Sequence, residues 1–286
     1  ENALELSVAQ QEAFHQIQTS FTTQEVCLLH GLTSSGKTEI YIKLIEEQLA
    51  SGKQVLYLLP EIALTTQLVQ RLTAYFGNQV AVFHSKYTNN ERIEVWNQVL
   101  ENSHKAKVVI GVRSALFLPF SNLGLIVIDE EHEQTFKQQD PAPRYHARDA
   151  AIVLSKQHQA KVLLGSATPS LESFYNVSVA KYGLTSLTKR FGNVVLPDIE
   201  LVDLKDKYFR KKMNGHFSDV LLENITEVLG KGEQVILFQN RRGYSPIIEC
   251  LTCGNVPQCQ QCDVSLTYHQ HKNQLRCHYC GYAMAK

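Results

Sequence analysis

The sequence feature that most constrains this chain is a glycine-rich run that follows a short apolar stretch. Val26 to His30 is mostly apolar, the motif G-x-x-x-x-G-K-T occupies residues 31–38, and a helical pattern runs from Glu39 to Ala50. A strand, a glycine loop and a helix N-terminus in this order form the context in which the motif binds phosphate. The run therefore predicts a P-loop, and a chance glycine turn is the poorer alternative.

The residue types of this loop fit a bound triphosphate. Gly31 and Gly36 permit backbone conformations that other residues avoid, and the loop N–H groups form an anion cradle together with the helix dipole. We expect Lys37 to reach the β and γ phosphates and the Thr38 hydroxyl to ligate Mg²⁺. The predicted ATP-binding residues are Gly31, Leu32, Thr33, Ser34, Ser35, Gly36, Lys37 and Thr38.

A helix predicted over Leu4–Phe21 comes just ahead of the P-loop strand and carries Gln10. Because of this position, Gln10 is a further candidate for ATP binding, as a reader of the adenine edge. A solvated helix residue is an equally good interpretation.

The equal numbers of basic and acidic residues show that the chain is not basic as a whole. Lys+Arg and Asp+Glu both number 28 in the 286 residues, so any contact with nucleic acid must come from local patches. No apolar run is long enough to span a membrane, and the N-terminus lacks the order of a signal peptide, so we expect no membrane partner. The chain starts at Glu1 and stops six residues after its last cysteine, and we expect it to be a fragment.

Short apolar runs alternate with helical patterns as far as residue 164. Such alternation predicts βαβ units and a parallel sheet, in which ligands bind at the carboxyl ends of the strands. Polar motifs follow these runs at the predicted strand ends. The predicted strands after the P-loop are 54–59, 79–83, 107–110, 125–128 and 161–164.

Two carboxylates directly follow the predicted strand 125–128. We expect Asp129 to hold Mg²⁺, and Glu130 to orient and deprotonate the attacking water. His132 is expected to couple this site to the 166–168 loop. With Lys37, these three residues are the candidate catalytic residues. A strand that merely ends in solvated acids is a poor alternative beside a complete P-loop.

Asp129 to His132 reads D-E-E-H, and Ser166 to Thr168 reads S-A-T. A P-loop, D-E-x-H and S-A-T in this order resemble the superfamily 2 helicases. Finer matches narrow the resemblance to the replication-restart helicases of bacteria, over essentially the whole chain. These matches are Gly31–Glu39, Pro60–Thr65, Gly111–Leu116, Asp129–His132, Gly165–Pro169 and Asn240–Gly243.

This resemblance implies an ATP-dependent DNA helicase that moves 3′ to 5′ and restarts stalled replication forks through primosome assembly. The implied partners are forked and single-stranded DNA, primosome proteins and single-strand-binding proteins. The implied setting is the bacterial cytoplasm, at forks in the nucleoid, and we expect a monomer. The implied cofactors are ATP, Mg²⁺ and Zn²⁺.

The implied fold is α/β, with a RecA-like lobe and a mostly parallel sheet. We expect this ATP-binding lobe over 1–190, the beginning of a second RecA-like lobe over 191–248, and an incomplete zinc-binding insertion over 249–286. A predicted edge strand Pro197–Leu204, a helix Asp219–Leu229 and a strand Gln234–Phe238 belong to the second lobe. Because the family's arginine-finger motif is missing, we expect the fragment to bind ATP but to hydrolyse it poorly.

One residue departs from the family pattern inside the P-loop. Ser34 stands where the resemblance implies a glycine. We expect little effect from this serine, unless the position requires a positive φ.

The stretch after D-E-E-H carries candidates for DNA coupling. Phe136 and Tyr145 lie beside Lys137 and Arg144, a combination able to stack bases and hold phosphates. The resemblance implies an aromatic-rich loop that couples single-stranded DNA to ATP hydrolysis, and Arg113 is a weaker candidate. An ordinary loop with two anchoring aromatics is an equally good interpretation.

Six of the seven cysteines form three C-x-x-C pairs in the last 37 residues. Such a thiol cluster indicates structural zinc in a reducing cytosol rather than disulfides or a redox dithiol. Two pairs separated by 14 residues suit one Cys₄ site, made of Cys259, Cys262, Cys277 and Cys280.

Cys250 and Cys253 would then be half of a second zinc site, which the family completes with a fourth pair beyond Lys286. The competing arrangement joins Cys250 and Cys253 with Cys259 and Cys262. The neighbouring His269 and His278 are expected to be bystanders.

Two rival functions stay open. One is a different P-loop motor, such as a restriction or RNA-remodelling translocase, although such motors do not place three C-x-x-C pairs after N-R-R-G. The other is a zinc-dependent scaffold that binds fork proteins and uses nucleotide only as a switch. Lys37→Ala in the full protein separates them, since a motor loses unwinding whereas a scaffold keeps loading its partners.

Overall fold

A computed structural model describes residues 4–60, 66–84, 87–140, 142–188, 197–238, 248–250, 252–260, 264–278 and 280–285. By its internal contacts the chain divides into two compact units, Glu1–Leu196 and Pro197–Lys286. Of the helices in these ranges, none combines the length and the apolar character needed to cross a lipid bilayer.

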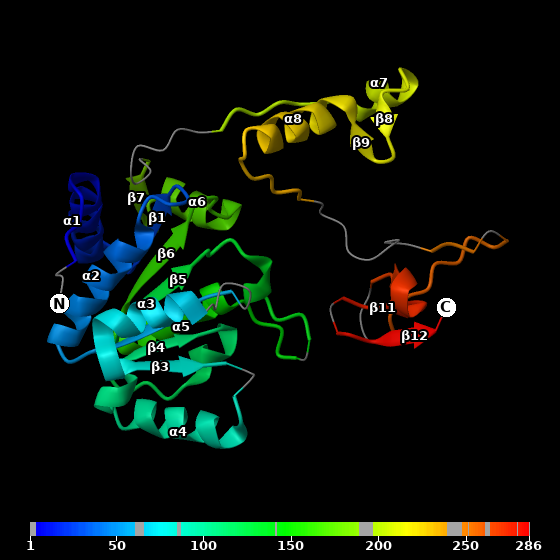
Figure 1. Ribbon diagram of the computed structural model, residues 1–286. Helices are drawn as coiled ribbons and strands as arrows, with labels where there is room; N and C mark the ends of the chain where they lie inside the picture. Colours follow the sequence, from blue (N-terminus) through cyan, green and yellow to red (C-terminus); the bar gives the residue numbers. More distant parts are fainter. Residues whose placement is uncertain are drawn as a thin grey trace. The chain divides into compact units, whose positions relative to one another are not determined.

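The first unit is built on a seven-stranded sheet whose strand pairs all run parallel (Figure 1). The expected α/β fold with a mostly parallel sheet is thereby confirmed. The spatial order is β3-β4-β2-β5-β6-β1-β7. The strands are β1 (Val26–Gly31), β2 (Gln54–Leu58), β3 (Val80–Phe83), β4 (Val108–Gly111), β5 (Leu123–Asp129), β6 (Lys161–Ser166) and β7 (Gly183–Leu187).

The register of the central strands brings the polar motifs together. β6 lies between β1 and β5, with His30 beside Ser166 and Asp129 beside Gly165. The carboxyl ends of parallel strands lie at the same edge of a sheet. The P-loop, the S-A-T motif and the D-E-E-H run Asp129–His132, which we call the acidic motif, therefore share that edge.

Helices cover both faces of this sheet, and each strand contributes alternate residues to two cores. α1 (Val8–Thr23), α2 (Lys37–Ala50) and α3 (Thr66–Phe76) pack on one face, against side chains such as Leu29 and Tyr57. α4 (Asn89–Leu100), α5 (Ala147–His158) and α6 (Leu171–Ser178) pack on the other face.

Three local details of the first unit differ from expectation. α1 begins at Val8 rather than Leu4, because the Ser7 side chain caps the helix in a reciprocal box with Gln10. β7 was not predicted, since it is an edge strand in which only alternate residues are buried. The expected loop after β4 contains a 3₁₀ turn, Arg113–Phe117.

The second unit holds short elements and two small antiparallel sheets. Its helices are α7 (Leu204–Phe209) and α8 (Asp219–Gly230), the latter confirming the expected helix. β8 (Met213–Asn214) pairs with β9 (Phe217–Ser218). In the cysteine-rich part, β11 pairs with both of its neighbours. These strands are β10 (Thr267–His269), β11 (Gln274–Arg276) and β12 (Ala283–Ala285).

Two strands expected here are not formed. Residues 197–203 contain no strand, and α7 begins at Leu204, where the Asp203 carboxylate accepts hydrogen bonds from the N–H groups of Lys205 and Asp206. Residues 234–238 also contain no strand, and Ile236 is 94% exposed. A strand needs a paired neighbour, and these residues have none within the described chain. The expected N-R-R-G and P-E-I-A-L-T motifs lie almost entirely outside the described residues.

Candidate active site and metal centre

The P-loop connects β1 to α2 and places a glycine at each end. Gly36 caps α2 with φ at 85°, in the left-handed region that favours glycine. At Gly31 a Cβ atom would lie 2.9 Å from Cγ of Lys37, so the glycine leaves room for the lysine stem. Lys37 is nearly buried, and its Nζ donates to the Gly31 carbonyl oxygen at 2.9 Å.

A buried hydroxyl inside this loop has no protein partner among the described residues. It is Oγ of Ser35, whose residue is 4% exposed. Buried polar groups nearly always find a hydrogen-bond partner. An unsatisfied hydroxyl among loop amides beside a lysine ammonium therefore fits a loop that accepts phosphate oxygens.

The backbone of Ser34 has the positive φ that would make a serine unfavourable at this position. Its φ is 61°, in the left-handed region. A non-glycine residue pays a steric cost there, so this position does require a positive φ. The exception attached to this expectation therefore applies, and we expect that a glycine at this position would relieve backbone strain.

The two acids of the acidic motif sit in different surroundings. Asp129 ends β5, and its carboxylate accepts hydrogen bonds from the Tyr41 hydroxyl at 3.0 Å and the Tyr57 hydroxyl at 3.2 Å. Burial raises the pKa of Asp129, while the Tyr41 hydroxyl and the Lys37 ammonium partly offset this. Burial, and then the charge of Asp129, raises the pKa of Glu130.

The P-loop and these acids line one cavity of about 550 Å³. Lys37 and Glu130, which lie far apart in sequence, therefore face the same space. Arg71 also lines it and forms an ion pair with Glu39. The loop residues that line the cavity are Thr33, Ser34, Ser35, Gly36, Lys37 and Thr38. A more open hollow of about 1040 Å³ lies along α1 and β7 and holds none of these residues.

The remaining nucleotide candidates lie at the border of this cavity or outside it. Gln10 is a lining residue, but its amide already bonds the protein: Nε2 donates to the Gly36 carbonyl at 3.2 Å, and Oε1 accepts from the Ser7 N–H at 2.8 Å. Its predicted role with adenine stays a prediction. Leu32 lies outside the lining, and its N–H donates to the Leu187 carbonyl.

His132 contacts the S-A-T loop. Its Nδ1 lies 2.7 Å from the Ser166 hydroxyl, and its Nε2 lies 3.4 Å from the Thr168 hydroxyl. Nδ1 is also 3.7 Å from a carboxylate oxygen of Glu130. The geometry thus links the acidic motif to the expected loop, and the coupling role of His132 stays a prediction.

Glu131 received no role from the sequence, yet it is fully buried. Its carboxylate pairs with Arg148 at 2.9 Å and accepts hydrogen bonds from the Ser170 N–H at 2.7 Å and the Ser173 hydroxyl at 2.8 Å. Ser170 is the N-cap of α6. Glu131 therefore fastens the end of β5 to α5 and α6, and no local pattern in the sequence signals this.

The DNA-coupling candidates lie on the loop that carries Phe136 to Tyr145, except for Arg113. Hydrogen bonds within this loop and from Arg113 hold it closed. Arg113 donates to the carbonyls of Thr135 and Lys137, and Lys137 donates to the Arg144 carbonyl at 2.7 Å. Tyr145 is half-buried and meets the ring of Phe117 edge-on, with centroids 5.0 Å apart. Arg144 is exposed.

Phe136 departs from its expected use. It is 1% exposed and belongs to the hydrophobic core, so its ring is not available to stack on a base. The burial makes Phe136 an anchor of the loop, which corrects the base-stacking interpretation for this residue. The coupling role of the loop as a whole stays a prediction.

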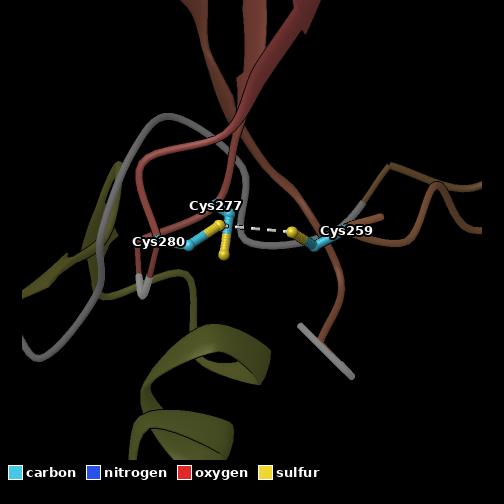
Figure 2. Close-up of side chains that lie close together, drawn as sticks. All are labelled: Cys259, Cys277 and Cys280. Carbon is cyan, nitrogen blue, oxygen red and sulfur yellow. Dashed lines mark hydrogen bonds between the residues drawn. The ribbon is translucent and has the colours of Figure 1, made fainter. Parts of the chain in front are cut away.

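Three cysteines of the second unit converge, as Figure 2 shows. The sulfur atoms of Cys259, Cys277 and Cys280 all lie within 4.8 Å of one another. Cys262 lies outside the described residues. The cluster joins the second pair to the third, which favours the first of the two expected arrangements.

Among the described residues, Cys250, Cys253, His269 and His278 do not belong to this cluster. Cys250 and Cys253 are exposed, and hydrogen bonds from the backbone of Thr252 and Cys253 lower the pKa of the Cys250 thiol. His269 and His278 approach each other, with Nε2 atoms 3.0 Å apart, and neither belongs to the thiol group.

The DEAD/DEAH box helicase model matches residues 7–177, and a model of the PriA DNA helicase Cys-rich region matches residues 259–284. The replication restart protein PriA of Bacillus subtilis (strain 168) is 46% identical over 281 residues, 98% of this chain and 34% of that protein. The PriA of Haemophilus influenzae is 50% identical over 281 residues, 98% of this chain and 37% of that protein. The chain thus spans about a third of these relatives, and the resemblance drawn from the motifs is confirmed.

Two solved helicase structures show a partial similarity to this chain. RecG bound to a three-way DNA junction superposes with a TM-score of 0.47 and 22% identity, over 64% of this chain and 24% of that chain. The DUF1998 helicase MrfA bound to DNA superposes with a TM-score of 0.48 and 18% identity, over 65% of this chain and 27% of that chain.

Proposed function

The chain belongs to the DEAD/DEAH box helicase family, and from this premise we propose that it is the ATP-binding part of a DNA helicase of replication restart. In this proposal residues 1–190 form the first motor lobe, 191–248 begin the second, and 249–286 belong to a zinc-binding insertion. The complete protein would use ATP to move 3′ to 5′ along DNA at stalled forks. The relatives named as replication restart proteins support this assignment.

One observation carries the proposal: Lys37 and the two acids line the same cavity. Cleavage of a phosphoanhydride requires cationic and N–H donors on the phosphates and a carboxylate on the water side. Ser35, with its unsatisfied buried hydroxyl, adds a donor where a phosphate would lie. A P-loop far from the acids would not support hydrolysis.

Each residue has a proposed part in that chemistry. Lys37 would exchange the Gly31 carbonyl for a phosphate oxygen, and Glu130 would accept a proton from water, for which its raised pKa is suited. Thr38 and Asp129 would hold Mg²⁺, which neutralises phosphate charge when bound. His132 would couple conformational changes at this site to the S-A-T loop through its contact with Ser166.

We propose that Cys259, Cys277 and Cys280 hold a structural zinc ion together with Cys262. Sulfur atoms around tetrahedral zinc lie about 3.8 Å apart, and the cluster fits this, since its three sulfurs all lie within 4.8 Å. Cys250 and Cys253 would contribute to a second site. Thiolates suit zinc, which would fasten the short strands of this region.

The proposed partners are forked and single-stranded DNA, primosome proteins and single-strand-binding proteins, met by a monomer in the bacterial cytoplasm at replication forks. The exposed Arg144 and the loop that carries it would contact a DNA backbone. The names of the relatives support the replication setting.

Residues 1–286 alone are proposed to bind ATP but to hydrolyse it slowly. The cations lining the described cavity are Lys37 and Arg71, and Arg71 is already paired with Glu39. A stabilising arginine supplied from outside the first lobe accounts for a large share of catalysis in related phosphoryl transfer.

The test is equilibrium binding of a fluorescent ATP analogue to residues 1–286. Lys37→Ala should weaken binding at least about tenfold, because it removes a charged hydrogen bond to phosphate. Lys43→Ala is the matched control, since Lys43 lies on the same helix but pairs with Glu46. Equal affinity of wild type and Lys37→Ala would contradict the proposal, and brisk DNA-stimulated turnover would contradict slow hydrolysis.

A further inference from the structure

Two buried tyrosines hold the carboxylate of Asp129 from two different elements. Tyr41 comes from α2 and Tyr57 from β2, and neither is exposed to solvent. The Tyr41 hydroxyl donates to Oδ1 of Asp129 at 3.0 Å, and the Tyr57 hydroxyl donates to Oδ2 at 3.2 Å. The two rings pack edge-on against each other, with centroids 5.8 Å apart.

The glycine that precedes the S-A-T motif leaves room for this arrangement. Gly165 is the cross-strand neighbour of Asp129 in the β5–β6 pairing. A Cβ atom at Gly165 would lie 1.8 Å from the Tyr41 hydroxyl oxygen and 3.4 Å from Oδ1 of Asp129. Any larger residue would therefore push Tyr41 away from the carboxylate.

We propose that Tyr41 and Tyr57 are positioning residues that hold the carboxylate of Asp129 in one orientation, toward the nucleotide cavity. This inference rests on the proposed function, which places Mg²⁺ at Asp129. With one phenol on each oxygen, the carboxylate cannot rotate without breaking a buried hydrogen bond. A third donor, the Glu130 N–H at 3.1 Å from Oδ1, completes the set.

The electrostatics agree with this geometry. Burial raises the pKa of both phenols well above their ordinary value, so they stay protonated and can donate to the carboxylate. Burial also raises the pKa of Asp129, and the two phenols counter that effect together with Lys37 from α2. The other charged groups acting on this cluster are Glu130 and, on the Tyr57 side, Arg71 of α3.

The variants Tyr41→Phe and Tyr57→Phe keep the rings and remove only the hydroxyl groups. In residues 1–286, each should raise the Mg²⁺ concentration for half-maximal binding of a fluorescent ATP analogue about tenfold, the value of one hydrogen bond to a charged group. Binding of the analogue without Mg²⁺ should be unchanged. Tyr75→Phe is the control, because Tyr75 is partly exposed on α3. Unchanged Mg²⁺ dependence in both variants would overturn the inference.

A second readout uses the metal-free protein without nucleotide. In a crystal structure of each variant, the carboxylate of Asp129 should be rotated from its wild-type orientation, because one of its oxygens has lost a donor. An Asp129 carboxylate that keeps its orientation in both variants would mean that the hydroxyl groups do not position it, and would also overturn the inference. If the carboxylate rotates in the variants but wild type binds no nucleotide, the proposed function fails and the positioning of Asp129 stands.

Discussion

The parallel-sheet unit and the cysteine-rich sheet hold themselves together by different means. In the first, strands buried on both faces pack into two large hydrophobic clusters. The cluster of the cysteine-rich part is small, and two of its four buried members, Cys259 and Cys277, are cysteines. A core of this size stabilises little on its own. From this comparison we expect that burial stabilises the first unit, and that a metal ion would be needed to stabilise the sheet of the cysteine-rich part.

Metal removal should have the largest effect of the changes considered. It tests whether the two regions really are stabilised by different means. A chelator should expose the amides of 264–278 to hydrogen exchange and leave those of β5 protected, because zinc supplies roughly 10–16 kcal/mol in small zinc domains. Cys277→Ser should reproduce this loss, and Cys27→Ser, in β1, should affect only the first unit. Unchanged protection of 264–278 under chelation, read by mass spectrometry, would contradict the metal's role.

Glu131→Ala should produce the next largest effect, confined to the first unit. It leaves Arg148 without its buried partner, so the free energy of unfolding should fall by about 3–5 kcal/mol. Trp96, the sole tryptophan of the chain, lies on α4 and reports that unit alone in a denaturant titration. Asp149→Ala is the control: this partner of Arg148 is 62% exposed and its loss should cost less than about 1 kcal/mol. Equal losses would mean that burial does not decide the cost.

Asp129→Asn should stabilise the first unit modestly at neutral pH. The folded pKa of Asp129 is raised by burial, so its ionised form destabilises the folded state. The substitution should therefore raise the free energy of unfolding by roughly 1 kcal/mol near pH 7, with the gain vanishing below the ordinary aspartate pKa of about 4. Denaturant titrations across that range check this. A gain that increases toward acid pH would reverse the assigned sign.

Ser34→Gly should have the smallest effect and tests strain in the P-loop. Relief of the left-handed conformation outweighs the entropy cost of glycine, so stability should rise by about 0.5 kcal/mol. Ser51→Gly is the control, because Ser51 follows α2 with φ at −87° and should only lose stability. Thermal melts of both variants measure the difference, and a loss at both positions would show that Ser34 is not strained.

Sequence patterns predicted the central strands and the polar motifs at their ends, because each buried parallel strand is a short apolar run closed by a motif. They did not predict β7, whose alternating burial leaves little apolar signal. They also expected a strand at 234–238, where the residue types suit a sheet but the described chain offers no partner.

The sequence predicted those residues of the site that belong to a motif with a fixed spacing, and it did not predict the others. Lys37 and Asp129 belong to such motifs, whereas Tyr41 and Tyr57 have the composition of ordinary core residues, and only the tertiary structure brings their hydroxyls to Asp129. Phe136 shows the reverse error, since an aromatic beside basic residues suggested a surface role and the ring is buried.

The most direct measurement is a crystal structure of residues 1–286 grown with Mg²⁺ and a non-hydrolysable ATP analogue. The account predicts the triphosphate on the 31–38 loop, with Nζ of Lys37 on a phosphate oxygen and the carboxylates of Asp129 and Glu130 facing the γ phosphate. A nucleotide seated elsewhere, for example in the hollow along α1 and β7, with Lys37 still bonded to the Gly31 carbonyl, would contradict it.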